Sequence, residues 1–578
     1  MNKILLYGGL ALTTLGASLN SFGQQRYLDE IFTDSQIEIL KDKTYGTNVD
    51  FLKNTSLLDP AYLGANQTAI GTEMAGLKAA FANGTQIAPE YYLPFAADSS
   101  TLVKVSDMKM DIYMPKASED TVSERPVMLY VHTGNFLPPV VNGGPNGSKE
   151  DSAAVELCKQ WAKRGYVAIA ANYRGGWNPV AAGPTGALVR RATLLNAVYR
   201  AIHDMKQVVR VIRDDSEDGN QYAIDRNFIT LYGQGSGGYV SVAYNTLDKS
   251  SEMALPKFTN PLTQESFINE AVVGNLDGEG GLLNMYYNNG QPVSIQACIN
   301  AGGALADISW LEGNIEAPMM SIHAVRDAFA PFDTGTVIVP TTGEDVVDVN
   351  GANMFIAKAV ALGVNDYFKD SVYTDAYSAR AASLYGQSFS GVPTINVNDP
   401  IVIDQNADGL FALDLPMAQG SPWEWWSKTD LDAYVAAVNQ LTGGNYNSND
   451  IHANALITNQ MMSKAHALTY IDSIQGYIHP RLMHARTNTP DVPSSIREVS
   501  AHNTFKMYPN PASTQVTISS NEGFVKSVQV FDITGKLVIS NQSNSVQVTL
   551  NTENLPNGVF LVQVQTNQGI EVEKLIIE

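Results

Sequence analysis

Cysteine, positive charge and long apolar runs are all scarce in this sequence. Only Cys158 and Cys298 occur among 578 residues, which excludes a disulfide framework and favours two buried free thiols. Lys and Arg number 37 against 58 Asp and Glu, and the resulting net charge of -21 argues against a nucleic acid partner. Beyond the first 23 residues, no stretch has the length of a transmembrane segment.

The composition that remains is that of a folded protein with more than one domain. Hydrophobic residues make up 44% of the chain and charged residues 16%, which is typical of globular proteins. A chain of 578 residues exceeds the size of one ordinary core, so two or three domains are expected.

The first 23 residues predict a removable signal peptide. Lys3 gives a positive start, residues 4–15 form a short apolar core, and Ser21-Phe22-Gly23 offers small residues to a signal peptidase. Cleavage is expected before Gln24 or Gln25. Residues 24–100 carry no chemical motif, and we interpret them as an N-terminal extension or cap.

The C-terminal residues predict a separate module. Residues 484–503 lack apolar periodicity and contain Pro and Ser, as a linker does. From residue 504 to 578, short alternating strands are separated by Gly, Asn and Pro turns, which predicts a small Ig-like β-sandwich.

Several motifs of this module occur in a recognisable order. They are Tyr508-Pro509-Asn510-Pro511-Ala512, Thr534-Gly535-Lys536, Leu555-Pro556-Asn557-Gly558 and the closing Glu573-Lys574-Leu575-Ile576-Ile577-Glu578. Residues 504–578 closely resemble the type A C-terminal sorting domain of type IX secretion substrates. The resemblance implies a partner, the type IX secretion machinery. It also implies export through the periplasm and outer membrane of a Gram-negative bacterium, to the cell surface or the medium.

Between the two ends, residues 101–483 predict an α/β domain with a mainly parallel sheet flanked by helices. Residues 101–115 predict a hairpin at the sheet edge, and buried strands are expected at 127–131, 166–171, 227–232, 294–300 and 318–324. Helical periodicity is clearest at 149–164, 192–214, 353–361 and 430–439.

This order resembles the α/β-hydrolase fold, in its esterase, lipase and carboxylesterase branch. The segment His132-Thr133-Gly134-Asn135 stands where that branch has its oxyanion loop, and Gly233-Gln234-Gly235-Ser236-Gly237-Gly238 stands at the nucleophile elbow. The segment from Ile322 to Asp327 resembles the part that carries the acid. The resemblance implies an acyl-transfer scaffold whose loop and elbow residues include His132, Gly134, Asn135, Gly233, Gly235 and Gly237.

The elbow can be aligned in two frames. In the first, Gly233 and Gly237 flank Gly235, so the nucleophile position carries no side chain. In the second, Ser236 is the nucleophile, but Gln234 then replaces a glycine that the tight turn needs. These steric grounds favour the first frame.

A base is also missing from its usual place. The region after the predicted acid, residues 409–426, contains no His, which leaves His479 or another His of residues 452–484 as a substitute. Two functions therefore stay open: a non-catalytic surface protein that binds an unknown small molecule, ester or glycan, and a secreted ester or peptide hydrolase. The hydrolase would use Ser236, Asp327 and His479.

Two weaker patterns lie near residue 415. Asp404, Asn406 and Asp408 match the start of a calcium loop, but Leu415 replaces the bidentate Glu, and an Asx turn is the alternative. No metal site or cofactor is otherwise expected. Trp423, Trp425 and Trp426 could line a glycan or acyl pocket, or belong to core packing.

Overall fold

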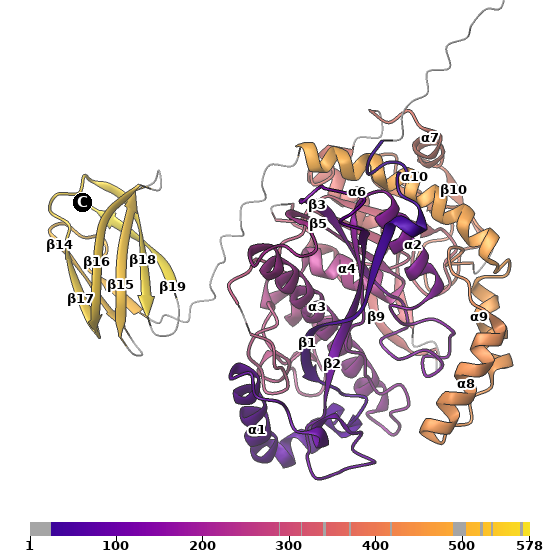
Figure 1. Cartoon of the computed structure of the whole chain (residues 1–578), viewed down its shortest axis with the longest axis horizontal. Coiled ribbons are helices and arrows are strands. Elements are labelled where there is room, and N and C mark those ends of the chain that lie inside the picture. The colour runs from indigo at the N-terminus through magenta and orange to yellow at the C-terminus, as the bar shows by residue number, and fades with distance from the viewer. Residues whose placement is uncertain are drawn as a thin grey trace, which may run out of the picture. The chain divides into compact units, whose positions relative to one another are not determined.

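The chain folds into two compact units, residues 1–494 and 495–578 (Figure 1). The computed structural model describes residues 25–287, 289–313, 315–338, 343–368, 372–416, 419–488, 505–520, 524–532, 536–566 and 570–578. The predicted signal peptide, most of the predicted linker and the turn at Thr534-Gly535 lie outside these ranges.

One eight-stranded sheet forms the centre of the larger unit. Its strands in chain order are β1 (Ile37–Val49), β2 (Val105–Pro115), β3 (Arg125–Val131), β4 (Val167–Ala171), β5 (Ile224–Gln234), β6 (Ala297–Ala301), β7 (Met319–Ala324) and β12 (Leu410–Leu413). In space they follow the order β1-β2-β4-β3-β5-β6-β7-β12. β2 is antiparallel to both of its neighbours, and the six strands from β4 to β12 are parallel. This is the strand order of the α/β-hydrolase fold, so the predicted fold class is confirmed.

Helices cover both faces of the sheet (Figure 1). One face carries α3 (Gly186–Glu217), α4 (Ser236–Thr246) and α6 (Ala352–Ala361), and the other carries α2 (Ser152–Lys163) and α10 (Lys464–Asn488). Successive strand residues point to opposite faces, so Leu129 packs in the core with α3 while Tyr130 packs with α2. Burial on both faces explains why β3 is apolar along residues 127–131.

Two boundaries predicted from the sequence are wrong. Residues 101–115 contain no hairpin, because they supply the single strand β2, and its antiparallel edge partner β1 comes from the N-terminal extension. Helix α10 runs to Asn488, beyond the predicted domain end at residue 483, and Arg486 on its last turn donates a hydrogen bond to Asp225. Residues 24–100 therefore extend the sheet edge, and they add helix α1 (Pro60–Ala82), which packs in a small separate core together with Leu283 and Met285.

The remaining elements are insertions around the last strands. Between β5 and β6 lies α5 (Glu270–Val273), and between β7 and β12 lie the hairpin β8 (Thr334–Ile338) and β9 (Asp345–Asn350), then α7 (Ala376–Ala382), β10 (Ser388–Phe389) and β11 (Ile401–Val402). After β12 come α8 (Lys428–Thr442) and α9 (Ser448–Thr458), which precede α10.

The smaller unit consists of two antiparallel sheets. One contains β13 (Phe505–Tyr508), β14 (Gln515–Ser520) and β17 (Gln547–Asn551), and the other β15 (Val525–Asp532), β16 (Leu537–Ser545), β18 (Gly558–Thr566) and β19 (Ile570–Ile577). Both sheets contribute to one apolar core, which includes Ile518, Val530 and Val562. The predicted β-sandwich is confirmed.

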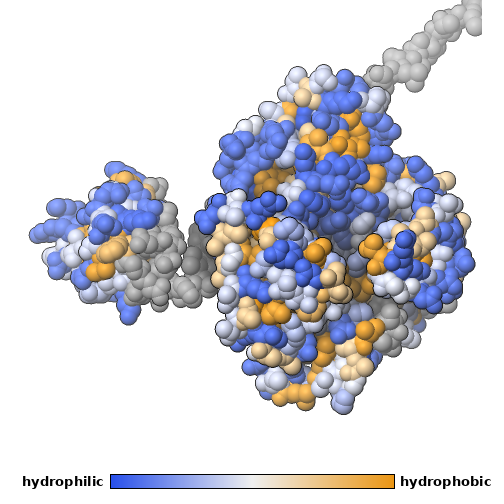
Figure 2. All heavy atoms as spheres, turned by 60° about the horizontal axis from the view of Figure 1, so that its bottom comes forward, coloured by the Kyte–Doolittle hydropathy of each residue, from blue (hydrophilic) through white to orange (hydrophobic). Residues whose placement is uncertain are grey.

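Both cysteines lie in the core of the larger unit. Cys158 on α2 and Cys298 on β6 are both buried and free. Among the described helices, none combines the length and apolar character that crossing a bilayer requires. The face in Figure 2 shows hydrophilic and apolar residues interspersed.

Candidate functional site

A cavity of about 630 Å³ lies at the carboxyl ends of the parallel strands. Loops that follow five of the parallel strands each contribute a residue to its lining: Thr133 after β3, Gly235 after β5, Gly302 after β6, Asp327 after β7 and Gly420 after β12. Open α/β sheets bind their ligands at this edge, because the loops after successive parallel strands meet there. Of the residues predicted from the elbow, the oxyanion loop and the acid segment, Gly134, Asn135, Gly235, Ser236 and Asp327 line this cavity, and His132, Gly233 and Gly237 do not.

Gly235 occupies the sharp turn between β5 and α4. Its φ of 55° and ψ of -118° belong to a region that side chains rarely adopt. The flanking glycines are required by packing, since a Cβ on Gly233 would lie 1.9 Å from the Gly237 carbonyl oxygen, and one on Gly237 would lie 2.2 Å from the Val131 carbonyl oxygen. The turn thus has the backbone of a nucleophile elbow, with a glycine at its apex.

Thr133 fills the space that a side chain at the apex would need. A Cβ built on Gly235 would lie 2.3 Å from Thr133 Oγ1 and 3.0 Å from Thr133 Cβ. Real Cβ atoms essentially never approach another atom to 2.3 Å, so a serine at position 235 requires the Thr133 side chain to move. The apex therefore carries no side chain, and Thr133 Oγ1 lies close to the position that a Cβ would take.

Ser236 lies one residue further on, at the start of α4, and its side chain is buried. Its hydroxyl accepts a hydrogen bond from the Asn135 backbone N–H at 3.1 Å and lies 3.2 Å from the Tyr173 hydroxyl. Burial raises the pKa of Tyr173 well above its ordinary range, so this phenol is not a base that could take the serine proton. The Ser236 hydroxyl is a bonded part of the loop packing.

The predicted oxyanion loop surrounds that hydroxyl. Gly134, Asn135 and Phe136 all have positive φ, and a Cβ on Gly134 would lie 2.6 Å from the Gly147 Cα. The Asn135 N–H would be a donor to an oxyanion in an active enzyme, but here it is bonded to Ser236. His132 stacks on Tyr173 with ring centroids 4.2 Å apart, and burial lowers its pKa to about 4.

Asp327 stands in the loop after β7, where the resemblance placed an acid. Its Oδ1 accepts hydrogen bonds from the backbone N–H groups of Phe329 and Ala330, at 2.8 and 3.0 Å. The carboxylate is buried, which raises its pKa, and its Oδ2 lies 3.9 Å from His323 Nε2. His323 is itself buried within β7, with Nε2 also 3.2 Å from the Ala330 carbonyl oxygen.

No histidine lines the cavity among the residues that the structure describes. His479 lies elsewhere, because its Nδ1 pairs with the Tyr166 hydroxyl at 3.0 Å, and Tyr166 precedes β4 at the opposite end of the sheet from Gly235. His452 accepts the indole N–H of Trp426. The residue beside the acid is Gly420, whose Cβ would lie 2.6 Å from Asp327 Oδ2. The structure brings Ser236 and Asp327 to one cavity and does not bring His479 there.

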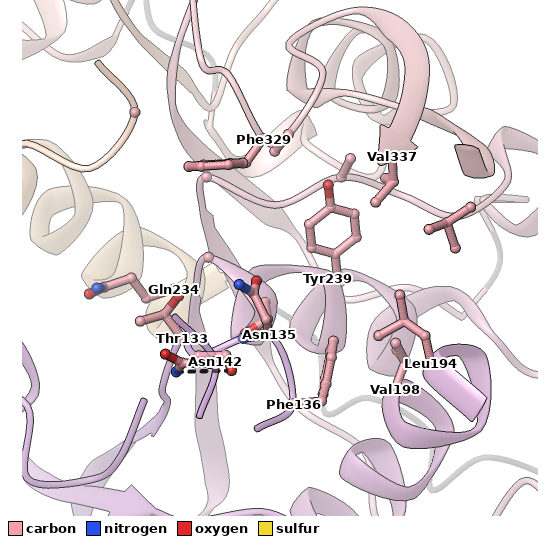
Figure 3. Close-up of a pocket in the computed structure, with 18 of the residues that line it drawn as sticks. Thr133, Asn135, Phe136, Asn142, Leu194, Val198, Gln234, Tyr239, Phe329 and Val337 are labelled. Carbon is pink, nitrogen blue, oxygen red and sulfur yellow. Dashed lines mark hydrogen bonds between the residues drawn. The ribbon is translucent and has the colours of Figure 1, made fainter. Parts of the chain in front are cut away.

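The cavity has a polar end and an apolar end. Figure 3 shows Thr133, Asn135, Asn142 and Gln234 gathered on one side, Leu194, Val198, Phe136 and Val337 on the other, and Tyr239 between them. The apolar end is completed by side chains of α3, α4 and the β8–β9 hairpin. Of the predicted tryptophan cluster, Trp423 and Trp426 line the cavity, while Trp425 packs against the core shared with α2.

Glu424 holds the polar end together. Its Oε1 accepts a hydrogen bond from Gln234 Nε2 at 2.6 Å, and its Oε2 accepts one from Asn146 Nδ2 at 3.1 Å. Burial and the nearby Asp327 charge both raise the pKa of Glu424. Sequence reasoning missed Glu424 and Thr133, although a threonine beside Gly134 was a readable departure from the glycine-rich loop.

The segment with the calcium-like pattern forms an Asx turn, in which the Asn406 backbone N–H bonds to Asp404 Oδ1 at 2.7 Å. Asp404 and Asn406 are exposed, and Asp408 is half-buried. Among the described residues, no group of three or more His, Cys, Asp or Glu side chains is placed to hold a metal ion.

Comparison with known proteins identifies one part of the chain. Residues 506–578 match the family model of the secretion system C-terminal sorting domain. No curated protein sequence matches the chain. A structure of PorZ, a surface component of the type IX secretion system of Porphyromonas gingivalis, matches at 22% identity and a TM-score of 0.13, over 15% of this chain and 13% of that one.

Two solved hydrolases match part of the chain. Esterase 2 of Thermogutta terrifontis, phosphorylated by paraoxon, is 19% identical with a TM-score of 0.23, over 39% of this chain and 69% of the esterase. MGS-M1, an α/β hydrolase from a deep-sea metagenome of the Medee basin, is 13% identical with a TM-score of 0.22, over 39% of this chain and 66% of MGS-M1. Residues 506–578 are thus a secretion sorting domain, and the protein is secreted or displayed on the cell surface.

Proposed function

We propose that this chain is an exported binding protein that uses an α/β-hydrolase scaffold without hydrolase chemistry. The proposal depends on the elbow. Gly235 has the backbone angles of the tight turn on which a nucleophile would stand, and Thr133 occupies the space that a side chain at position 235 would need. The cavity itself remains large enough for a small molecule.

The other parts of an acyl-transfer site support the same conclusion. Hydrolysis needs a nucleophile, a base that takes its proton and free donors for the oxyanion. Ser236 is bonded to Asn135, and the described lining of the cavity holds no histidine. Asp327 accepts hydrogen bonds from backbone N–H groups of its own loop, so it has bonding partners without a base.

Ester turnover and active-site labelling test the proposal on the full chain. We expect no hydrolysis of short-chain p-nitrophenyl esters above the buffer rate and no labelling by a fluorophosphonate, in the parent and in Ser236→Ala alike. The double variant Thr133→Gly/Gly235→Ser supplies a serine and the room for it, so fluorophosphonate labelling should be higher in this variant than in the parent or in Ser236→Ala. Turnover in the parent that vanishes in Ser236→Ala would establish the hydrolase instead.

The export step is tested separately by ending the chain at Asn503. Loss of the sorting domain should leave the shortened protein in the periplasm, where fractionation and immunoblotting detect it. Undiminished delivery of the shortened chain to the surface or medium would contradict a role of this domain in export.

A further inference from the structure

The charges around the cavity are all of one sign. Its described lining contains two carboxylates, Asp327 and Glu424, and no Lys, Arg or His. Neither carboxylate forms an ion pair with Lys or Arg among the described residues. Their partners are backbone N–H groups, amide side chains, the Ser421 side chain and the buried ring of His323, whose pKa burial lowers. Burying a carboxylate without a counter-charge costs free energy, and a cation on a ligand would offset that cost.

A second observation at the polar end points to a hydrogen-bond donor on the ligand. Asn459 lines the cavity with 1% of its surface exposed, and its Nδ2 donates to the backbone oxygens of Ser421 and Glu424. Its Oδ1 is buried without a partner in the described structure, as is the hydroxyl of Tyr239. Buried polar atoms are normally hydrogen-bonded, so an acceptor in this position indicates a missing N–H or O–H group.

The rest of the lining is suited to a hydrocarbon. Leu194, Val198 and Val337 line the end opposite the amides in Figure 3, and Phe258 and Trp310 extend it. Three aromatic side chains, Trp423, Trp426 and Phe329, line the same cavity as the two carboxylates. Aromatic rings attract cations as well as apolar groups, and they do not attract an anionic head group in this way.

We propose that the cavity binds an amphiphile whose head is a protonated amine and whose tail is a hydrocarbon chain. The ammonium group lies between Glu424 and Asp327 and donates to Asn459, and the tail extends past Tyr239 toward Leu194. The inference rests on the proposed binding function and specifies its ligand class. The net charge of -21 adds to it, because an acidic protein raises the local concentration of cations.

The test compares three ligands of equal tail length on the full chain. Decylammonium, decanol and decanoate each contain ten carbons and carry a positive, a neutral and a negative head group. Four tryptophans of the lining (Trp177, Trp310, Trp423 and Trp426) provide a fluorescence signal that calorimetry can check. We expect decylammonium to bind at least about tenfold more tightly than decanol, and decanoate to bind most weakly.

Two variants separate the head from the tail. Glu424→Gln should weaken decylammonium at least about tenfold and leave decanol unchanged, whereas Leu194→Ala should weaken both ligands alike. Glu265→Gln, an exposed carboxylate outside the cavity lining, is the matched control and should change neither. Asp327→Asn serves as the second head-group variant if Glu424→Gln unfolds.

Each outcome decides the inference. Binding of decanol or decanoate at least as tight as that of decylammonium overturns it while leaving a binding protein. An unchanged preference for the amine in both Glu424→Gln and Asp327→Asn overturns it as well. If no amphiphile binds, the ligand class is wrong. The proposed absence of hydrolysis is decided separately, by comparing the ester turnover of the parent with that of Ser236→Ala.

Discussion

The elbow after β5 and the acid loop after β7 lie in one cavity but differ in what their side chains do. At the elbow the backbone has the geometry of a nucleophile turn, yet the apex is Gly235 and Thr133 fills the free space. At the acid loop, Asp327 is present and its carboxylate bonds to two N–H groups of the same loop. A carboxylate with structural partners needs no catalytic partner, so its presence alone is weak support for catalysis.

The largest expected effect is a loss of stability when a side chain is introduced next to the elbow. Gly237→Ala places a Cβ 2.2 Å from the Val131 carbonyl oxygen, and we expect the free energy of unfolding to fall by about 3 kcal/mol or more. Denaturant titration measures the loss. Gly64→Ala, in helix α1 with no atom within 4 Å of the new Cβ, is the matched control and should stabilise by about 1 kcal/mol or less.

A double-mutant cycle tests whether Thr133 and the apex compete for space. Gly235→Ser alone combines a positive φ with an overlap, so a loss of about 2 to 4 kcal/mol is expected. In the Thr133→Gly background the overlap is gone and the loss should be smaller by at least about 1 kcal/mol. Additive losses would show that Thr133 does not occupy the nucleophile's place.

The acid loop is tested by two substitutions of Asp327. Asp327→Ala leaves the N–H groups of Phe329 and Ala330 without their acceptor, and about 2 kcal/mol of stability should be lost. Asp327→Asn keeps an acceptor oxygen and should cost less than about 1 kcal/mol. Equal losses in the two variants would mean that the charge, rather than the hydrogen bonds, holds the loop.

The smallest effect is a pH dependence of binding. Burial raises the pKa of Glu424 and of Asp327, so both ionise further as the pH rises above the ordinary range of carboxyl groups, and a ligand with a permanent cation should bind more tightly as the pH rises. Decyltrimethylammonium is such a ligand. Asp151, whose pKa burial raises to about 8, also interacts electrostatically with Glu424. Calorimetry should give a flatter profile for Glu424→Gln, and a flat parent profile would exclude titrating carboxylates.

The sequence was informative where the pattern is local. The apolar runs of β3 and β7 and the glycines of the elbow follow from neighbouring residues, and the frame with Gly235 at the apex agrees with the turn geometry. The pairing of β1 with β2 was missed, because alternation shows that a strand exists and not which segment it pairs with. Glu424 was missed for the same reason, since its partners Gln234 and Asn146 are distant in the chain.

The separate cores of the two units have a consequence for maturation. In the described structure, the sandwich core draws only on residues from Phe505 onward, and the cores of the larger unit use none beyond Ala485. A protease that cleaves between Asn488 and Phe505 therefore removes no side chain from either core. Cleavage there would leave the larger unit with every described residue that lines its cavity.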